Sequence, residues 1–153
     1  GLNYGAGDYK RVRRITAVCL ATVAAVGLIV GNLSYIFGRE LLGIYITDSQ
    51  EAVSYGMERL KFMLIPYFLC GIMDTVTGSM RGIGSSVIPM VITIMGVCVM
   101  RVVWIYTVFT MPRYHSFSGL FISYPISWLL TFAAVFSAYL IIIKKREKAA
   151  ATT

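Results

Sequence analysis

The sequence predicts an all-α membrane protein, a polytopic bundle of helices. Four long apolar stretches fill most of the 153 residues, and short polar connectors separate them. Each stretch is about 19 to 25 residues long, which is the length an α-helix needs to cross the hydrocarbon core of a bilayer. Hydrophobic residues make up 58% of the chain and the mean hydropathy is +0.75, values well above those of a soluble domain.

The predicted spans are residues 15–37, 62–80, 87–109 and 119–143. Backbone polar groups in lipid must form their hydrogen bonds within their own segment, so we expect each span to be a helix. The first and last spans contain no charged residue. A soluble helical bundle would need polar helix faces, and the first span has none, which argues against that alternative.

The connector over residues 38–61 is long enough to hold its own helix. Asp48, with Glu51 three residues later, matches a capping box and predicts a short surface helix that leads straight into the second span. Pro66, Pro89 and Pro125 fall within the spans, where a proline removes a backbone hydrogen bond and bends the helix.

Small residues recur at four-residue spacing, as in Gly27 with Gly31 and in Gly78 with Gly82. Such rows allow the backbones of two helices to approach closely in lipid. We expect them to pack the helices into a compact bundle.

Basic residues are distributed unevenly between the two sides that four spans define. The side with both termini holds nine, and the other side holds four: Arg39, Arg59, Lys61 and Arg113. Because basic residues favour the cytoplasmic side, we expect both termini and the turn at residues 81–86 to be cytoplasmic. The net charge of +7 therefore marks the flanks of membrane helices, and no nucleic-acid partner is expected.

No arrangement typical of an enzyme or a metal site is present in the sequence. Cys19, Cys70 and Cys98 all fall in apolar spans, and none forms a metal-ligand spacing with His115, which is the single histidine. Nucleophile–base pairs and nucleotide-binding loops are also missing. We therefore expect no enzymatic activity and no cofactor.

Asp74 and Arg101 are the charged residues inside the spans. Placing a charge in lipid costs at least about 2.5–3.5 kcal/mol, so such residues usually face a partner or a watery cavity. They lie about 18 Å and about 12 Å from the outer ends of their helices, which allows a buried pair. Such a pair is either purely structural or belongs to a site where Asp74 alternately binds a coupling cation.

Three polar residues could add oxygen ligands or substrate contacts to such a site: Asn32, Thr75 and Thr77. The same side chains also serve as hydrogen-bonding contacts between membrane helices, and both interpretations stay open.

Two segments resemble the multidrug and toxic compound extrusion (MATE) family. Residues 1–14 read GLNYGAGDYKRVRR, and residues 78–89 read GSMRGIGSSVIP. The second lobe of that family carries a G-x-N-x-G-A-G-D loop and an R-G-x-G turn followed by a proline. The matching positions here are Gly1, Asn3, Gly5, Ala6, Gly7 and Asp8 in the first pattern, and Arg81, Gly82, Gly84 and Pro89 in the second.

The resemblance implies a twelve-helix transporter of two lobes, of which residues 1–153 are the last four helices. It implies cation-coupled antiport, in which drugs or other amphipathic organic compounds leave in exchange for H⁺ or Na⁺. An N-terminal lobe of the same protein would complete the cavity, and a first residue that is Gly1 and not Met agrees with this expectation. By the same resemblance the protein is located in the cell membrane.

Within this resemblance, the glycines allow tight turns and Asp8 caps the helix that follows. Some family members use an acidic residue for cation coupling on the helix that corresponds to the second span. The position expected for that residue is one turn before Asp74, near Cys70, where this sequence has no acid. A flippase for lipid-linked precursors or polysaccharides, of related architecture, is one alternative function. A membrane scaffold that transports nothing is another.

Overall fold

The computed structural model describes residues 1–47, 49–111 and 116–152, and every element in this part of the chain is a helix. Four helical runs are long and apolar enough to cross a membrane: Tyr9–Ile36, Gln50–Gly82, Val87–Thr107 and Ser118–Ala150. They contain most of each of the four predicted spans, and the third ends two residues before its span. The predicted fold class, a bundle of four membrane helices, is therefore confirmed.

The first run begins with a short helix and a glycine turn. Helix α1 (Leu2–Gly5) is followed by Gly7, whose φ of +73° is one that glycine adopts at little cost. Asp8 then caps α2 (Tyr9–Ile36), because its carboxylate accepts a hydrogen bond from the backbone N–H of Arg11 at 2.9 Å. The predicted cap is confirmed.

Two further helices occupy the connector between the first two spans. Helix α3 (Gly38–Tyr45) follows α2 almost directly, and the sequence analysis missed it. Helix α4 (Gln50–Leu64) is the predicted surface helix, but its N-cap is Ser49, whose hydroxyl accepts from the N–H of Ala52 at 3.2 Å. The prediction that Asp48 caps this helix is wrong by one residue, because the serine oxygen already satisfies the first turn. Asp48 itself lies outside the described residues.

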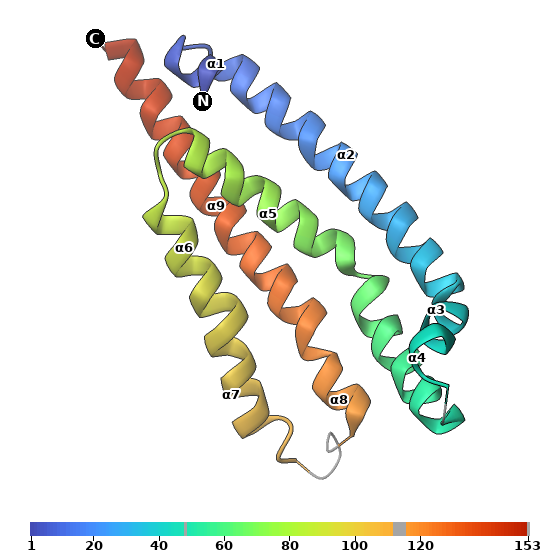
Figure 1. The fold of residues 1–153 in the computed structure, drawn as a ribbon. Coiled ribbons are helices and arrows are strands. Elements are labelled where there is room, and N and C mark those ends of the chain that lie inside the picture. Colours follow the sequence, from blue (N-terminus) through green and yellow to red (C-terminus); the bar gives the residue numbers. More distant parts are fainter. Residues whose placement is uncertain (48, 112–115, 153) are drawn as a thin grey trace.

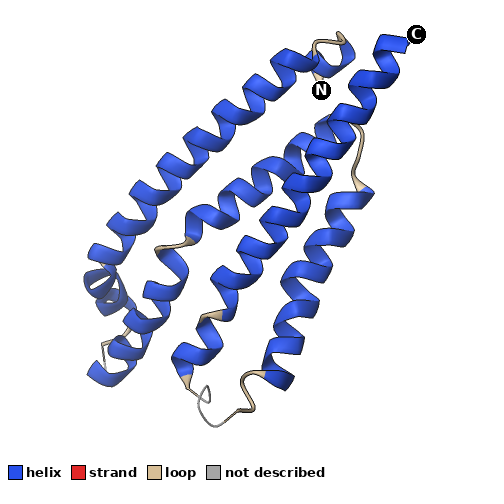
Figure 2. Ribbon diagram, turned by 180° about the vertical axis from the view of Figure 1, so that it is seen from behind, coloured by secondary structure: helices blue, strands red, loops and turns tan. Residues whose placement is uncertain are grey.

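Pro66 separates α4 from α5 (Tyr67–Gly82), and this break is visible as a bend in Figure 2. A proline lacks the N–H that would continue the α4 ladder. The turn after α5 uses a second left-handed glycine, Gly84, with φ of +80°. The two glycine-rich motifs thus both form tight turns, as predicted.

The third run is α6 (Val87–Thr93), a π-helix η1 (Ile94–Val99) and α7 (Met100–Thr107). Pro89 lies in the first turn of α6, where its missing N–H breaks no hydrogen bond, so the bend predicted there is absent. The irregularity occurs instead at η1. A Cβ built on Gly96 would lie 2.1 Å from the Thr131 hydroxyl oxygen, so the π-helical turn packs directly on the last helix.

The last run consists of α8 (Phe117–Phe121) and the long α9 (Ser123–Thr152). The helix is interrupted at Ile122, and Pro125 lies in the first turn of α9. Helix α9 continues nine residues beyond the predicted span end at Ile143, through the basic tail.

The four runs lie side by side, with α5 and α9 in the middle (Figure 1). Helix α2 packs on α5, and the α6–η1–α7 run packs on α9. Helix α1 and the end of α9 lie together at one end of the bundle, while α3, α4 and α8 lie at the other. The central cluster of buried side chains joins α5, the turn after it and α9, and consists of Val76, Met80, Ile83, Val135, Tyr139 and Ile143.

The Gly27 and Gly31 row is used for close packing, as predicted. A Cβ on Gly27 would lie 3.0 Å from the Phe68 Cα, and one on Gly31 would lie 2.4 Å from the carbonyl oxygen of Leu64. Both glycines therefore bring the backbone of α2 against the α4–α5 run. Gly78 has no neighbouring atom in the space a Cβ would occupy, and Gly82 lies against Gly1 instead.

Candidate functional site

Arg101 lies at the start of α7 and places its guanidinium on aromatic rings of α9. Its central carbon is 3.9 Å from the ring centre of Tyr124 and 5.9 Å from that of Trp128. The Nε of Arg101 donates to the hydroxyl oxygen of Ser127 at 3.4 Å. An aromatic face attracts a cation, and the attraction strengthens where water is excluded.

A third ring extends this cluster to α5. Tyr67 meets Trp128 edge to face with 6.3 Å between ring centres, and Tyr124 meets Trp128 in the same way at 6.1 Å. Trp128 and Ser127 are buried. We call this group the arginine–aromatic cluster: Tyr67, Arg101, Tyr124, Ser127 and Trp128. It connects three of the four helical runs around one positive charge.

The buried pair of Asp74 with Arg101, which the depths of the two residues allow, is not formed among the described residues of this structure. Arg101 turns to α9, whereas Asp74 lies on an exposed face of α5 and makes no hydrogen bond or ion pair with the described residues. The physical reason is the rotation of α5, because Met73, Val76, Thr77 and Met80 are the residues that it buries in the bundle. Neighbouring Asp74 must then point away from them.

The other three polar candidates are not gathered around Asp74. Thr75 bonds to the carbonyl of Gly71 at 2.9 Å, and Asn32 bonds to that of Leu28 at 2.7 Å. Since Gly31 packs at Leu64, Asn32 lies about 16 Å from Thr75 along the bundle. Thr77 is buried, and its hydroxyl has no partner among the described residues.

A separate group of hydroxyls joins three helices, and Thr75 contributes only its backbone carbonyl to it. Tyr139 of α9 donates to the Thr16 hydroxyl of α2 at 3.2 Å, and that hydroxyl lies 3.4 Å from the one of Ser79 in α5. Ser79 in turn donates to the carbonyl of Thr75 at 2.9 Å. These bonds hold the helices together, which is the structural role that the sequence analysis had left open for polar residues.

The sequence analysis missed the partners of Arg101. None of Tyr124, Ser127 and Trp128 was predicted there as part of a site. The available signal was the spacing, because Tyr124 is followed by Ser127 and Trp128 three and four residues later, on one helix face. Among the described residues no group of His, Cys, Asp and Glu side chains could hold a metal ion.

The two glycine motifs meet at the end of the bundle that carries the termini. A Cβ on Gly82 would lie 3.4 Å from the backbone nitrogen of Gly1, so the R-G-x-G turn packs against the start of the G-x-N-x-G-A-G-D loop. Arg13 of α2 and Glu147 of α9 form an ion pair of 2.5 Å at the same end. The segments that carry the family resemblance thus form one corner of the structure.

The chain is similar in sequence to known proteins. The chain is 23% identical over 145 residues to the probable multidrug resistance protein YoeA of Bacillus subtilis (strain 168), an alignment that covers 94% of this chain and 30% of the relative. The chain therefore spans about a third of the length of that protein. No solved structure matches the chain significantly. The MatE family model matches residues 1–107. With its four membrane-crossing helices, this chain is multi-pass and belongs to the MATE family, whose members are membrane transporters and not enzymes.

Proposed function

We propose that residues 1–153 are the last four helices of a MATE-type antiporter, in the second of its two lobes. The antiporter exports drugs or other amphipathic organic compounds and takes up H⁺ or Na⁺ in exchange. The family match over residues 1–107 carries this proposal. The relative in Bacillus subtilis, named as a probable multidrug resistance protein, supports the substrate class.

Asp74 is the residue that we assign to the coupling cation. It is the one carboxylate within the four predicted spans, and it is exposed on α5 and not neutralised by Arg101. An acidic side chain at this depth needs water, a cation or another part of the protein beside it. A coupling site provides the first two, and Thr75 and Thr77 lie on the same helix.

Arg101 has a supporting role in this proposal. The rings of Tyr124 and Trp128 stabilise its guanidinium without an ion pair, which leaves Asp74 available for a mobile cation. Asn32 lies toward the end of the bundle away from the termini, which is the outer side in the proposed orientation. There it is better suited to contact substrate that leaves the cavity than to bind the coupling ion.

The proposal is tested with the full-length protein, purified and reconstituted in liposomes. A fluorescent organic cation is placed outside, and a proton or sodium gradient is imposed. We expect dye to accumulate under one of the two gradients and to leave when the gradient is dissipated. Failure with both gradients, with a lipid-linked oligosaccharide flipped instead, would favour the flippase. Transport of neither substrate would favour a scaffold.

A further inference from the structure

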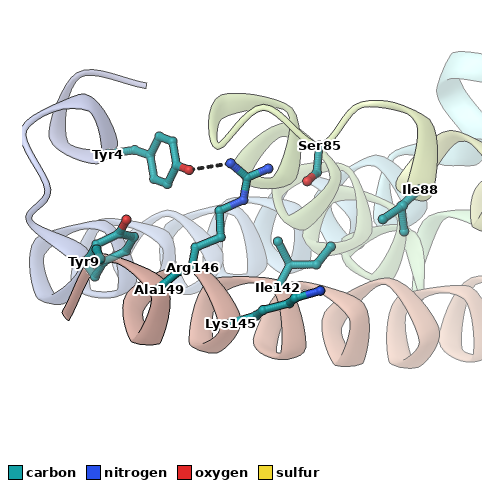
Figure 3. A pocket seen from close by; sticks show the side chains of 9 residues that line it. Tyr4, Tyr9, Ser85, Ile88, Ile142, Lys145, Arg146 and Ala149 are labelled. Atoms are coloured by element: carbon teal, nitrogen blue, oxygen red, sulfur yellow. Dashed lines mark hydrogen bonds between the residues drawn. The ribbon is translucent and has the colours of Figure 1, made fainter. Parts of the chain in front are cut away.

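A pocket of about 600 Å³ lies at the end of the bundle that carries both termini (Figure 3). Three segments distant in sequence form it: α1 and the start of α2, the turn before α6, and the last turns of α9. Two adjacent basic residues, Lys145 and Arg146, line one side. None of the 9 lining residues is acidic.

Arg146 is held in position at the pocket. Its guanidinium donates to the hydroxyl oxygen of Tyr4 at 2.6 Å, and its central carbon lies 5.6 Å from the centre of the Tyr4 ring. The side chain is half-buried, and Figure 3 shows its guanidinium turned toward the Tyr4 hydroxyl. A guanidinium has further N–H groups that can donate to an anion in a forked geometry.

Other polar groups at the pocket remain available to a ligand. Lys145 is exposed and makes no hydrogen bond or ion pair with the described residues. The hydroxyl of Ser85 likewise has no hydrogen bond within this part of the chain. The nearest acid on α9, Glu147, is engaged by Arg13 and does not line the pocket. The pocket therefore offers two cations and a hydroxyl to an anion, without an internal carboxylate in competition.

The pocket also has an apolar side, formed by Ile88 and Ile142. The apolar run of α9 ends at Ile143, and basic residues begin at Lys144. The pocket thus extends across the level where the membrane core meets the headgroups. A free inorganic anion would use only the basic side, whereas a phospholipid uses both.

We propose that this pocket binds an anionic phospholipid, with its phosphate between Lys145 and Arg146 and its glycerol and upper acyl carbons along Ile88 and Ile142. Basic pockets between membrane helices on the cytoplasmic side recognise such headgroups. The leaflet follows from the proposed orientation, but the binding chemistry does not depend on transport. Bound lipid would connect α1, the α5–α6 turn and α9.

The experiment is native mass spectrometry of the full-length protein in detergent, with equal amounts of phosphatidylglycerol and phosphatidylcholine. We expect retained phosphatidylglycerol, and a loss of about fivefold in its apparent affinity for Lys145→Gln and again for Arg146→Gln. Lys144→Gln is the matched control, because it removes the same charge one residue away, outside the pocket. It should leave the affinity unchanged.

A comparison of the two variants and a competition with inorganic phosphate make the result interpretable. Arg146→Gln also removes the hydrogen bond to Tyr4 and could unfold this end of the bundle. Lys145 has no partner within the described chain, so Lys145→Gln tests the site even in that case. An excess of inorganic phosphate should not displace the lipid. The proposal is overturned if phosphate displaces it, if Lys144→Gln weakens binding as much as Lys145→Gln, or if the two lipids are retained equally.

Discussion

At the scale of single residues, the guanidinium of Arg101 rests 3.9 Å above the ring of Tyr124. An arginine inside a membrane protein is usually matched with a carboxylate, and Asp74 is the carboxylate that the sequence offers. In the structure the aromatic rings and Ser127 take that place. The guanidinium of Arg101 is thus stabilised by side chains of α9, without an ion pair to Asp74 of α5.

The contact between Arg101 and Tyr124 predicts a measurable coupling. Arg101→Met and Tyr124→Leu in the full-length protein should each lower stability, and the double variant should lose less than the sum. The expected coupling energy is about 0.5–2 kcal/mol, the range for cation–π contacts from exposed to desolvated. Unfolding in detergent measures it.

In the parallel cycle of Arg101→Met with Asp74→Asn we expect additivity within about 0.5 kcal/mol. Stronger coupling to Asp74 would mean that the two charges pair after all.

Asp74 itself predicts a change in transport at unchanged abundance. Its side chain has no partner among the described residues, so Asp74→Asn should not disturb packing. Asp74→Asn should remove most of the ion-driven dye accumulation in liposomes, because the coupling cation loses its carboxylate ligand. Between two linked binding sites, a coupling free energy of about 1–3 kcal/mol corresponds to a roughly five- to 150-fold effect of the cation on dye affinity. Asp8→Asn is the matched control and should transport normally, because that residue caps α2 in an exposed turn. Full ion-driven transport by Asp74→Asn would remove Asp74 from the coupling site.

At the scale of elements, the close approach of α2 to the α4–α5 run requires a glycine at position 31. A Cβ at Gly31 would lie 2.4 Å from a backbone oxygen, that of Leu64, and a backbone cannot move aside as a flexible side chain can. Gly31→Ala should therefore destabilise the protein by about 1–3 kcal/mol, as overpacking does. Thermal unfolding in detergent checks this. Gly43→Ala, where nothing lies within 4 Å, is the control and should not destabilise. Equal stability of the two variants would contradict the close packing.

The helices were predictable because lipid imposes strict rules on length and hydropathy. The predicted spans, the Gly27–Gly31 row and the Asp8 cap all follow from local sequence, and the structure contains them. The π-helix η1 was not predictable, because its cause is the approach of α9 through Thr131, a residue distant in sequence. Helix α3 was missed because its eight residues carry no clear start signal.

The candidate site was less predictable than the fold. Sequence reasoning found Asp74 and Arg101 as the charges within the membrane but paired them, because depth along two helices was known and rotation about their axes was not. Successive side chains of an α-helix point about 100° apart, so a rotation of the helix by that angle presents a different residue to the neighbouring helix. The burial of Met73 and Thr77 fixes the rotation of α5, and only the packed structure supplies that information.

At the scale of the whole molecule, most basic residues of the described chain lie at the end that carries the termini. The Gly1–Gly82 contact, the Arg13–Glu147 pair and the proposed lipid pocket all lie there, with α3, α4 and α8 at the opposite end. The grouping agrees with the predicted asymmetry of nine basic residues against four. Because the two ends of the bundle differ in charge, the two possible orientations in the membrane can be distinguished by experiment.

The proposed orientation places the α5–α6 turn in the cytoplasm and the end of the α7 run outside. Basic residues are retained on the cytoplasmic side during insertion, so the end with nine of them should stay there. The test uses the full-length protein in intact cells, with its native cysteines, Cys19, Cys70 and Cys98 among them, replaced by alanine. A membrane-impermeant thiol reagent should label a cysteine introduced at Met111 and should leave one at Ser86 unlabelled until the cells are opened. Both positions are exposed in the structure, so access to the reagent depends on the side of the membrane alone.

Labelling at Ser86 but not at Met111 in intact cells would reverse the orientation. The lipid pocket would then face the outer leaflet, while its chemistry and the contacts of Arg146 would be unchanged.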